Sequence, residues 1–164
     1  MINNLLPRQA DNRFQGQKLG LWILSAVLLL FAAMSANSIF NGYFVASEVD
    51  GIPLATYTAD GAQAVVSIYA IWGVAQLTVV TFGIFVLVRY RALASLAFLV
   101  LLIEQILWRI VNHALPIAKS GPSSGAWFVY ALFAITLLGF ALSLWKRKSN
   151  AESLIPADVG RRAA

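Results

Sequence analysis

Residues 76–109, QLTVVTFGIFVLVRYRALASLAFLVLLIEQILWR, contain two long apolar runs that are separated only by Arg89-Tyr90-Arg91. The runs belong to segments of about 62–88 and about 92–115. Each segment is long enough to cross a hydrocarbon core of about 30 Å as a helix of roughly 20 residues. Because the basic break is so short, the second helix must return beside the first. This stretch therefore predicts an antiparallel pair of membrane-spanning helices.

Two further apolar segments flank this hairpin, at about 19–41 and about 126–145. A transmembrane barrel would instead show short stretches of alternating polarity. The chain of 164 residues is 60% apolar and 12% charged, whereas soluble domains usually carry about 45–50% apolar and about 25% charged residues. We therefore predict an all-α integral membrane protein, with an antiparallel four-helix bundle over residues 1–148 and a mobile cytoplasmic tail over residues 149–164.

The basic residues gather on one side of this predicted bundle. Of the twelve Lys and Arg residues, three precede the first span, two separate the second from the third, and five follow the fourth. Lys119 is in a loop on the opposite side, and Arg109 is within a span. Cytoplasmic loops of membrane proteins carry an excess of Lys and Arg. The pattern predicts a multi-pass protein of the bacterial cytoplasmic (inner) membrane with its N and C termini inside.

The sequence excludes several kinds of catalytic and metal site. It contains no cysteine and a single histidine, His113, so disulfides and thiolate sites cannot form and a centre with several histidine ligands is disfavoured. It also lacks a phosphate-binding loop, a dinucleotide fingerprint and a zinc-protease motif. We expect no catalytic residue, no cofactor, no metal and no nucleic-acid partner.

The third predicted span carries an unusual density of polar residues. Gln105, Arg109 and Asn112 recur at helical spacing and form one stripe, which His113 flanks. A charged side chain within a span costs about 2.5–3.5 kcal/mol on insertion scales, so such residues usually face a bundle interior or water. Glu104 lies about 100° around the helix from Gln105. We therefore expect Glu104 to face a different neighbour.

Depth along the helices places polar residues of different spans together. At about 1.5 Å per residue from the basic hairpin, Glu104 lies about 20 Å into the membrane and Gln76 lies at nearly the same depth. Because the hairpin makes them neighbours, we expect a hydrogen bond between Gln76 and Glu104. Arg109 lies at about 27 Å, near the level of Asn37 and close to Tyr69. The outer half of the bundle is thus predicted to be polar, and the inner half dry.

Two other features give expectations for the bundle. Of the five tryptophans, Trp72 and Trp108 lie away from the helix ends and are expected to belong to the core, whereas tryptophans at membrane interfaces occupy helix ends. The connection between about residues 42 and 60 mixes acidic and apolar residues. That mixture suits an interfacial half-helix or a cap over the mouth of the bundle.

Three functions are compatible with the polar cluster. The first is a non-catalytic accessory or structural subunit, or a scaffold for lipid or a partner, in which the polar groups join the helices by hydrogen bonds. The second is a protein that binds or transports a small ligand, anionic or lipidic, in an outward-facing cavity. The candidate ligand-binding residues are Asn37, Tyr69, Gln76, Glu104, Gln105, Arg109, Asn112 and His113.

The third function is a small intramembrane isomerase-like enzyme with Glu104 and His113 as acid and base. A regular helix places these two residues about 180° apart, which argues against their direct cooperation. The expected partners under all three functions are membrane lipid, other membrane protein subunits or a second copy of the chain.

Loose motifs between about Ser67 and Lys146 also suggest a family. They are the hairpin Val88-Arg-Tyr-Arg91, the stretch Trp108-Arg109-Ile-Val, and the basic end Lys146-Arg-Lys148. With them, the chain resembles a small, uncharacterised bacterial four-helix membrane family that is loosely grouped with DoxX-like proteins. The resemblance implies a four-helix membrane fold. It does not imply a redox role, because the Gly-rich and acidic positions of DoxX members are missing here.

Overall fold

A computed structural model of the chain describes residues 16–119 and 125–145. Within these residues every regular element is helical and no strand occurs, so the predicted all-α class is confirmed. The predicted tail at 149–164 lies outside the described residues.

Four long helices make up most of the described chain: α2 (Lys18–Phe40), α4 (Ala59–Arg89), α5 (Ala94–Ala114) and α6 (Ala126–Leu144). All four are long and apolar enough to cross a membrane; the third of these spans begins at Arg91, in the short turn η3 (Arg91–Leu93). The expectation of four long apolar helices is therefore confirmed. Each helix begins and ends within three residues of the range expected from the sequence.

Local sequence explains where α4 and α5 begin and end. The Thr58 side chain accepts a hydrogen bond from the Gly61 backbone N–H and so caps the start of α4. Tyr90 leaves the helical conformation with φ −132° and ψ 58°, which ends α4. Leu115, just beyond α5, precedes Pro116, and a residue before proline is disfavoured in the helical conformation.

The connection between α2 and α4 folds against the first turns of α4. It contains three short helical elements: α3 (Gly42–Phe44), η1 (Val45–Val49) and η2 (Leu54–Thr56). Its apolar residues form a small separate cluster with the start of α4, made up of Ala46, Ile52, Leu54, Ala62, Val65, Val66 and Tyr69. Gly51 makes the sharp turn between η1 and η2, because its φ of 74° is a conformation that other residues rarely adopt.

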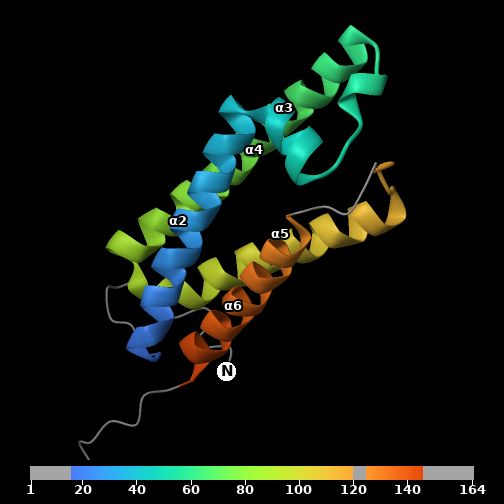
Figure 1. The fold of residues 1–164 in the computed structure, drawn as a ribbon. Helices are drawn as coiled ribbons and strands as arrows, with labels where there is room; N and C mark the ends of the chain where they lie inside the picture. The colour runs from blue at the N-terminus through green and yellow to red at the C-terminus, as the bar shows by residue number, and fades with distance from the viewer. Residues whose placement is uncertain (1–15, 120–124, 146–164) are drawn as a thin grey trace, which may run out of the picture.

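The four long helices form two pairs, which also pack against each other through α2 and α6. Figure 1 shows α2 beside α4 and α5 beside α6, with the pairs together at the end where α4 leads into α5 and apart at the other end. The contacting helices run antiparallel: on α2, Leu28 meets Gly83 of α4, and Ser35 meets Gly73. At the closed end the Gln17 backbone N–H donates to Leu142 O, which joins the start of α2 to the end of α6.

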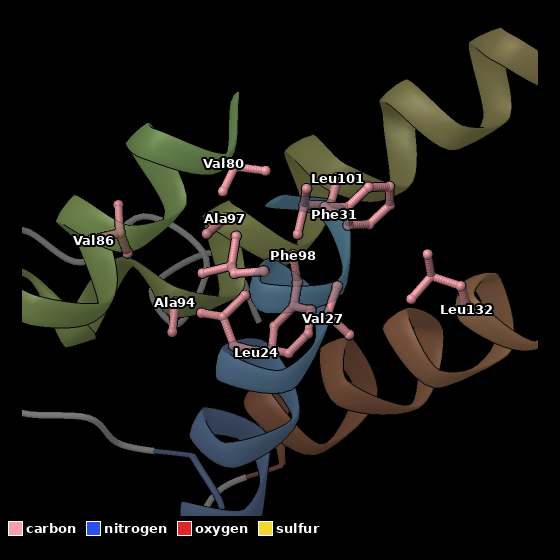
Figure 2. Packing of buried hydrophobic residues seen from close by; sticks show 11 residues of the cluster. Leu24, Val27, Phe31, Val80, Val86, Ala94, Ala97, Phe98, Leu101 and Leu132 are labelled. Carbon is pink, nitrogen blue, oxygen red and sulfur yellow. The ribbon is translucent and has the colours of Figure 1, made fainter. Parts of the chain in front are cut away.

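An apolar core fills the end where the pairs meet. Figure 2 shows side chains from all four long helices packed together there. The buried members are Leu24, Val27, Leu28 and Phe31 of α2, Val80 and Val86 of α4, Ala94, Ala97, Phe98 and Leu101 of α5, and Leu132 of α6. Because this cluster spans both pairs, it holds them together at one end. At the other end the Gly125 backbone N–H, just before α6, donates to the Val49 carbonyl oxygen of η1 at 3.3 Å.

Close packing between α2 and α4 depends on a missing side chain at Gly73. A Cβ there would lie 2.9 Å from the Ser35 backbone oxygen and 2.9 Å from Ile39 Cγ1, and a backbone atom cannot move aside cheaply. We expect Gly73→Leu to force the two helices apart and to lower stability by about 1–3 kcal/mol. The measurement is the apparent melting temperature of the purified protein in detergent micelles.

Ala75→Leu is the matched control, because Ala75 lies on the exposed face of the same helix. It adds a similar apolar side chain without entering the α2–α4 contact. Equal melting temperatures for the two variants would contradict this account of the helix pair.

Candidate functional site

A small cavity lies where the two helix pairs begin to separate. Its volume is about 50 Å³, larger than the roughly 10–15 Å³ that one water molecule needs. It is lined by Phe31, Met34, Ser35, Trp72, Gly73, Gln76, Glu104, Gln105, Trp108, Arg109, Val129 and Leu132. All four long helices therefore contribute to its walls.

One wall of this cavity carries the predicted contact between Gln76 and Glu104. Gln76 Nε2 donates a hydrogen bond of 3.2 Å to Glu104 Oε2, which joins α4 to α5. This confirms the pairing that depth along the two helices predicts. Gln76 is buried and Glu104 is half-buried. Glu104 Oε1 accepts no hydrogen bond from the described residues, so half of the carboxyl group still has acceptor capacity.

Gln105 contributes a second acceptor beside the cavity. Its Nε2 lies 3.4 Å from Thr136 Oγ1, and Thr136 Oγ1 lies 2.7 Å from the Leu132 carbonyl oxygen. The single hydroxyl hydrogen of Thr136 is thus donated to Leu132, so the Gln105 amide must donate to Thr136 and not accept from it. Gln105 Oε1 is consequently buried without a hydrogen-bond partner in the described part of the chain.

Arg109 is held by the backbone of two helices. Its Nη1 donates to the Gln105 carbonyl oxygen at 2.9 Å, and its Nη2 donates to the Val129 carbonyl oxygen at 3.2 Å. The guanidinium carbon lies 4.3 Å from the centre of the Phe133 ring and 5.5 Å from that of Tyr130. These contacts join α5 to α6 and hold the cation by carbonyl oxygens and aromatic faces.

An open groove lies next to the small cavity, on the side toward the open end of the molecule. Its volume is about 360 Å³, and Trp72 and Trp108 line both spaces. The other lining residues are Asp50, Ile52, Ile68, Tyr69, Val111, Asn112, Leu115, Ile117 and Lys119. We call the small cavity and the open groove together the interpair cleft.

The two tryptophans that join these spaces correct one expectation. The sequence places Trp72 and Trp108 in the core, but Trp108 is 37% exposed and neither belongs to the buried clusters of the described residues. The physical reason is the divergence of the helix pairs, which separates α4 from α5 at this level (Figure 1). The rings therefore face a cleft and not a packed interior.

The structure brings together six of the eight candidate ligand-binding residues. Those lining the interpair cleft are Tyr69, Gln76, Glu104, Gln105, Arg109 and Asn112. Asn37 lines neither space, and its Oδ1 accepts a hydrogen bond of 2.9 Å from Asn41 Nδ2. His113 is exposed and also lies outside both spaces, so it does not meet Glu104.

Spacing in the sequence did not identify Asp50, which lines the groove, or Thr136, which lies behind the small cavity. Asp50 Oδ2 accepts a hydrogen bond from the hydroxyl of Tyr69, which ties the connection after α2 to the wall of the groove. Thr136 of α6 accepts a hydrogen bond from the Gln105 amide. A threonine in the middle of an apolar span was a usable signal for Thr136. No helical spacing relates Asp50 to Tyr69, because Asp50 lies in an irregular connection.

Comparison with known proteins gives no match to a family model, to a curated protein or to a solved structure. The resemblance to DoxX-like proteins therefore stays a prediction, and the geometry of the cleft carries the functional interpretation.

The two carbonyl contacts of Arg109 predict a structural effect of its replacement. Arg109→Lys keeps the charge but replaces a planar fork by a single ammonium group, which cannot reach both carbonyls. We expect a loss of about 1.5–3 kcal/mol of stability, the usual contribution of hydrogen bonds to a charged group. The measurement is the apparent melting temperature in detergent micelles.

Arg89→Lys is the control for this substitution, because Arg89 is exposed at the end of α4. An unchanged melting temperature for Arg109→Lys would show that the guanidinium does not tie α5 to α6.

Proposed function

We propose that this chain is a non-catalytic, multi-pass protein of the bacterial inner membrane that holds a lipid-like molecule in the interpair cleft. The observation that carries the proposal is that the small cavity and the open groove adjoin at Trp72 and Trp108, which line both. Ligand sites are typically concave, mostly apolar and about 300–1,000 Å³ in volume, with a few placed polar groups. The interpair cleft has these properties.

The chemistry of the cleft favours an occupant with an apolar body and one hydrogen-bond donor. Its walls are mostly apolar and aromatic, including Phe31, Met34 and Leu132. At its narrow end, Glu104 Oε1 and Gln105 Oε1 are acceptors without a donor among the described residues. A hydroxyl group of a lipid would supply a hydrogen where the protein supplies none.

The same geometry makes an anionic ligand the weaker alternative at the narrow end of this cleft. Arg109 is the cation of the small cavity, and two of its five N–H groups donate to backbone carbonyl oxygens, which hold the guanidinium in place. An anion that reached the remaining N–H groups from the small cavity would lie near the Glu104 carboxyl group, which also lines it. A neutral donor does not meet this obstacle.

The distribution of charge supports a proposed orientation with both termini in the cytoplasm. Lys18, Arg89 and Arg91 lie at the closed end of the molecule, where α2 begins and α4 leads into η3. Lys119 lines the groove at the open end. By the preference of cytoplasmic loops for basic residues, the closed end faces the cytoplasm and the interpair cleft opens toward the outer face.

Tryptophan quenching tests occupancy of the cleft. The test protein keeps Trp72 and Trp108, while the exposed Trp22, Trp127 and Trp145 are changed to Phe. The probe is a monoacylglycerol with a dibrominated acyl chain, titrated into the protein in nonionic detergent. We expect saturable quenching, because bromine in the bound chain would lie against both rings.

Val129→Phe is the blocking variant, because Val129 lines the small cavity and a larger side chain would fill it. Ala131→Phe is its matched control, since Ala131 is exposed on the same helix. We expect at least a tenfold weaker apparent affinity for Val129→Phe alone. Quenching that is non-saturable, or equal in the two variants, would overturn the proposed site.

Reporter fusions test the orientation separately. A reporter that fluoresces only in the cytoplasm should be active at both termini, and a reporter that is active only in the periplasm should be silent at both. Periplasmic activity at either terminus would contradict the proposed topology.

A further inference from the structure

A second groove lies at the closed end of the molecule, between the start of α2 and the end of α4. Its volume is about 540 Å³. It is lined by Lys18, Leu21, Trp22, Ser25, Leu87, Val88 and Arg91. None of these residues lines the interpair cleft, so this α2–α4 groove is a separate feature.

The charged residues of the α2–α4 groove are two cations from different elements, Lys18 and Arg91. Arg91 Nε donates a hydrogen bond of 3.2 Å to the Leu87 carbonyl oxygen, which orients the guanidinium at the groove. The two terminal nitrogens of Arg91 and the ammonium group of Lys18 find no acceptor among residues 16–119 and 125–145. Both cations are exposed and lie beside one hollow.

The rest of the groove is apolar and strongly exposed. Trp22 is 75% exposed and Val88 is 66% exposed. Ser25 adds little polarity, because its hydroxyl donates to the Leu21 carbonyl oxygen at 2.9 Å. The groove thus combines a charged end and an apolar wall. Tryptophan is a preferred residue at the membrane interface, where those two environments meet.

We propose that the α2–α4 groove binds one anionic phospholipid, with its phosphate between Lys18 and Arg91 and an acyl chain along Leu21, Trp22 and Val88. Charge complementarity selects the headgroup, since basic pockets between spanning helices bind anionic headgroups. The apolar wall selects a lipid over a free phosphate ion, which would leave that wall uncovered. The proposal rests on the membrane-spanning role of the helices and not on the occupant of the interpair cleft.

Native mass spectrometry of the full chain in nonionic detergent tests this site. The probes are dioleoyl phosphatidylglycerol and dioleoyl phosphatidylcholine at equal concentration, which differ in net charge but not in acyl chains. We expect one phosphatidylglycerol to be retained at least tenfold more strongly than phosphatidylcholine. Equal retention of the two lipids would overturn the proposal.

Substitutions of neighbouring basic residues separate the groove from general surface charge. Lys18→Gln with Arg91→Gln removes both cations of the groove, and we expect the preference for phosphatidylglycerol to fall at least tenfold. Arg91→Gln alone removes one cation of the groove and should lower the preference, whereas Arg89→Gln removes one charge from an exposed position outside both hollows and should keep it. Equal losses for Arg91→Gln and Arg89→Gln would assign the preference to diffuse electrostatic attraction and overturn the site.

Ser25→Phe tests the place of the acyl chain, because it keeps both cations and fills the apolar part of the groove. We expect retention of phosphatidylglycerol to be lost while the apparent melting temperature stays close to that of the parent. Full displacement of the lipid by inorganic phosphate at millimolar concentration would show that only the headgroup is bound, and would contradict the proposed contact with the acyl chain. Quenching at Trp72 and Trp108 reports on the interpair cleft alone, so failure of either proposal can be recognised independently.

Discussion

The short turn at Tyr90 is the constraint on which the rest of the structure depends. Because only a few residues separate α4 from α5, these helices lie side by side at the turn. Residues that are equally far from the turn along the two helices therefore lie at the same level. That register brings Gln76 and Glu104 together at 3.2 Å. On the turn side of this hydrogen bond the helices enclose the apolar core; beyond it the two pairs diverge. One turn thus determines where the molecule has a packed apolar core and where it is open.

Glycines allow close packing within each pair and, at the closed end, between the pairs. In the first pair, Gly73 lets α4 approach the backbone of α2. Gly139 of α6 leaves room both for the Phe98 ring of α5, since a Cβ there would lie 2.5 Å from ring atoms, and for Ile23 of α2, at 2.7 Å. Arg109 joins the outer part of α5 to α6 through carbonyl oxygens of both helices. The interpair cleft lies where α4 and α5 separate beyond this packing.

Features that depend on distance along a helix could be predicted from the sequence. The four apolar segments and the Gln76–Glu104 contact follow from residue counting, because the rise per residue is nearly constant. The exposure of Trp108 and the isolation of His113 from Glu104 depend on how helices rotate and diverge, which spacing does not determine. Asn37 likewise accepts its hydrogen bond from Asn41, just after the end of the same helix. A partner one turn away is always within reach, so it competes with partners on other helices.

The two hollows differ in the kind of hydrogen-bonding group that they leave unused. In the interpair cleft the cation Arg109 is engaged by carbonyl oxygens, whereas Glu104 and Gln105 keep an oxygen without a donor among the described residues. In the α2–α4 groove the unused groups are donors. Arg91 donates from its Nε to the Leu87 carbonyl oxygen, and its two terminal nitrogens donate to no acceptor among the described residues. Unused polar groups in or near the hydrocarbon region are costly, and each kind is best satisfied by a complementary group. A donor therefore suits the cleft and an anion suits the groove, which is the physical basis for proposing two lipid sites of different selectivity on one helical framework.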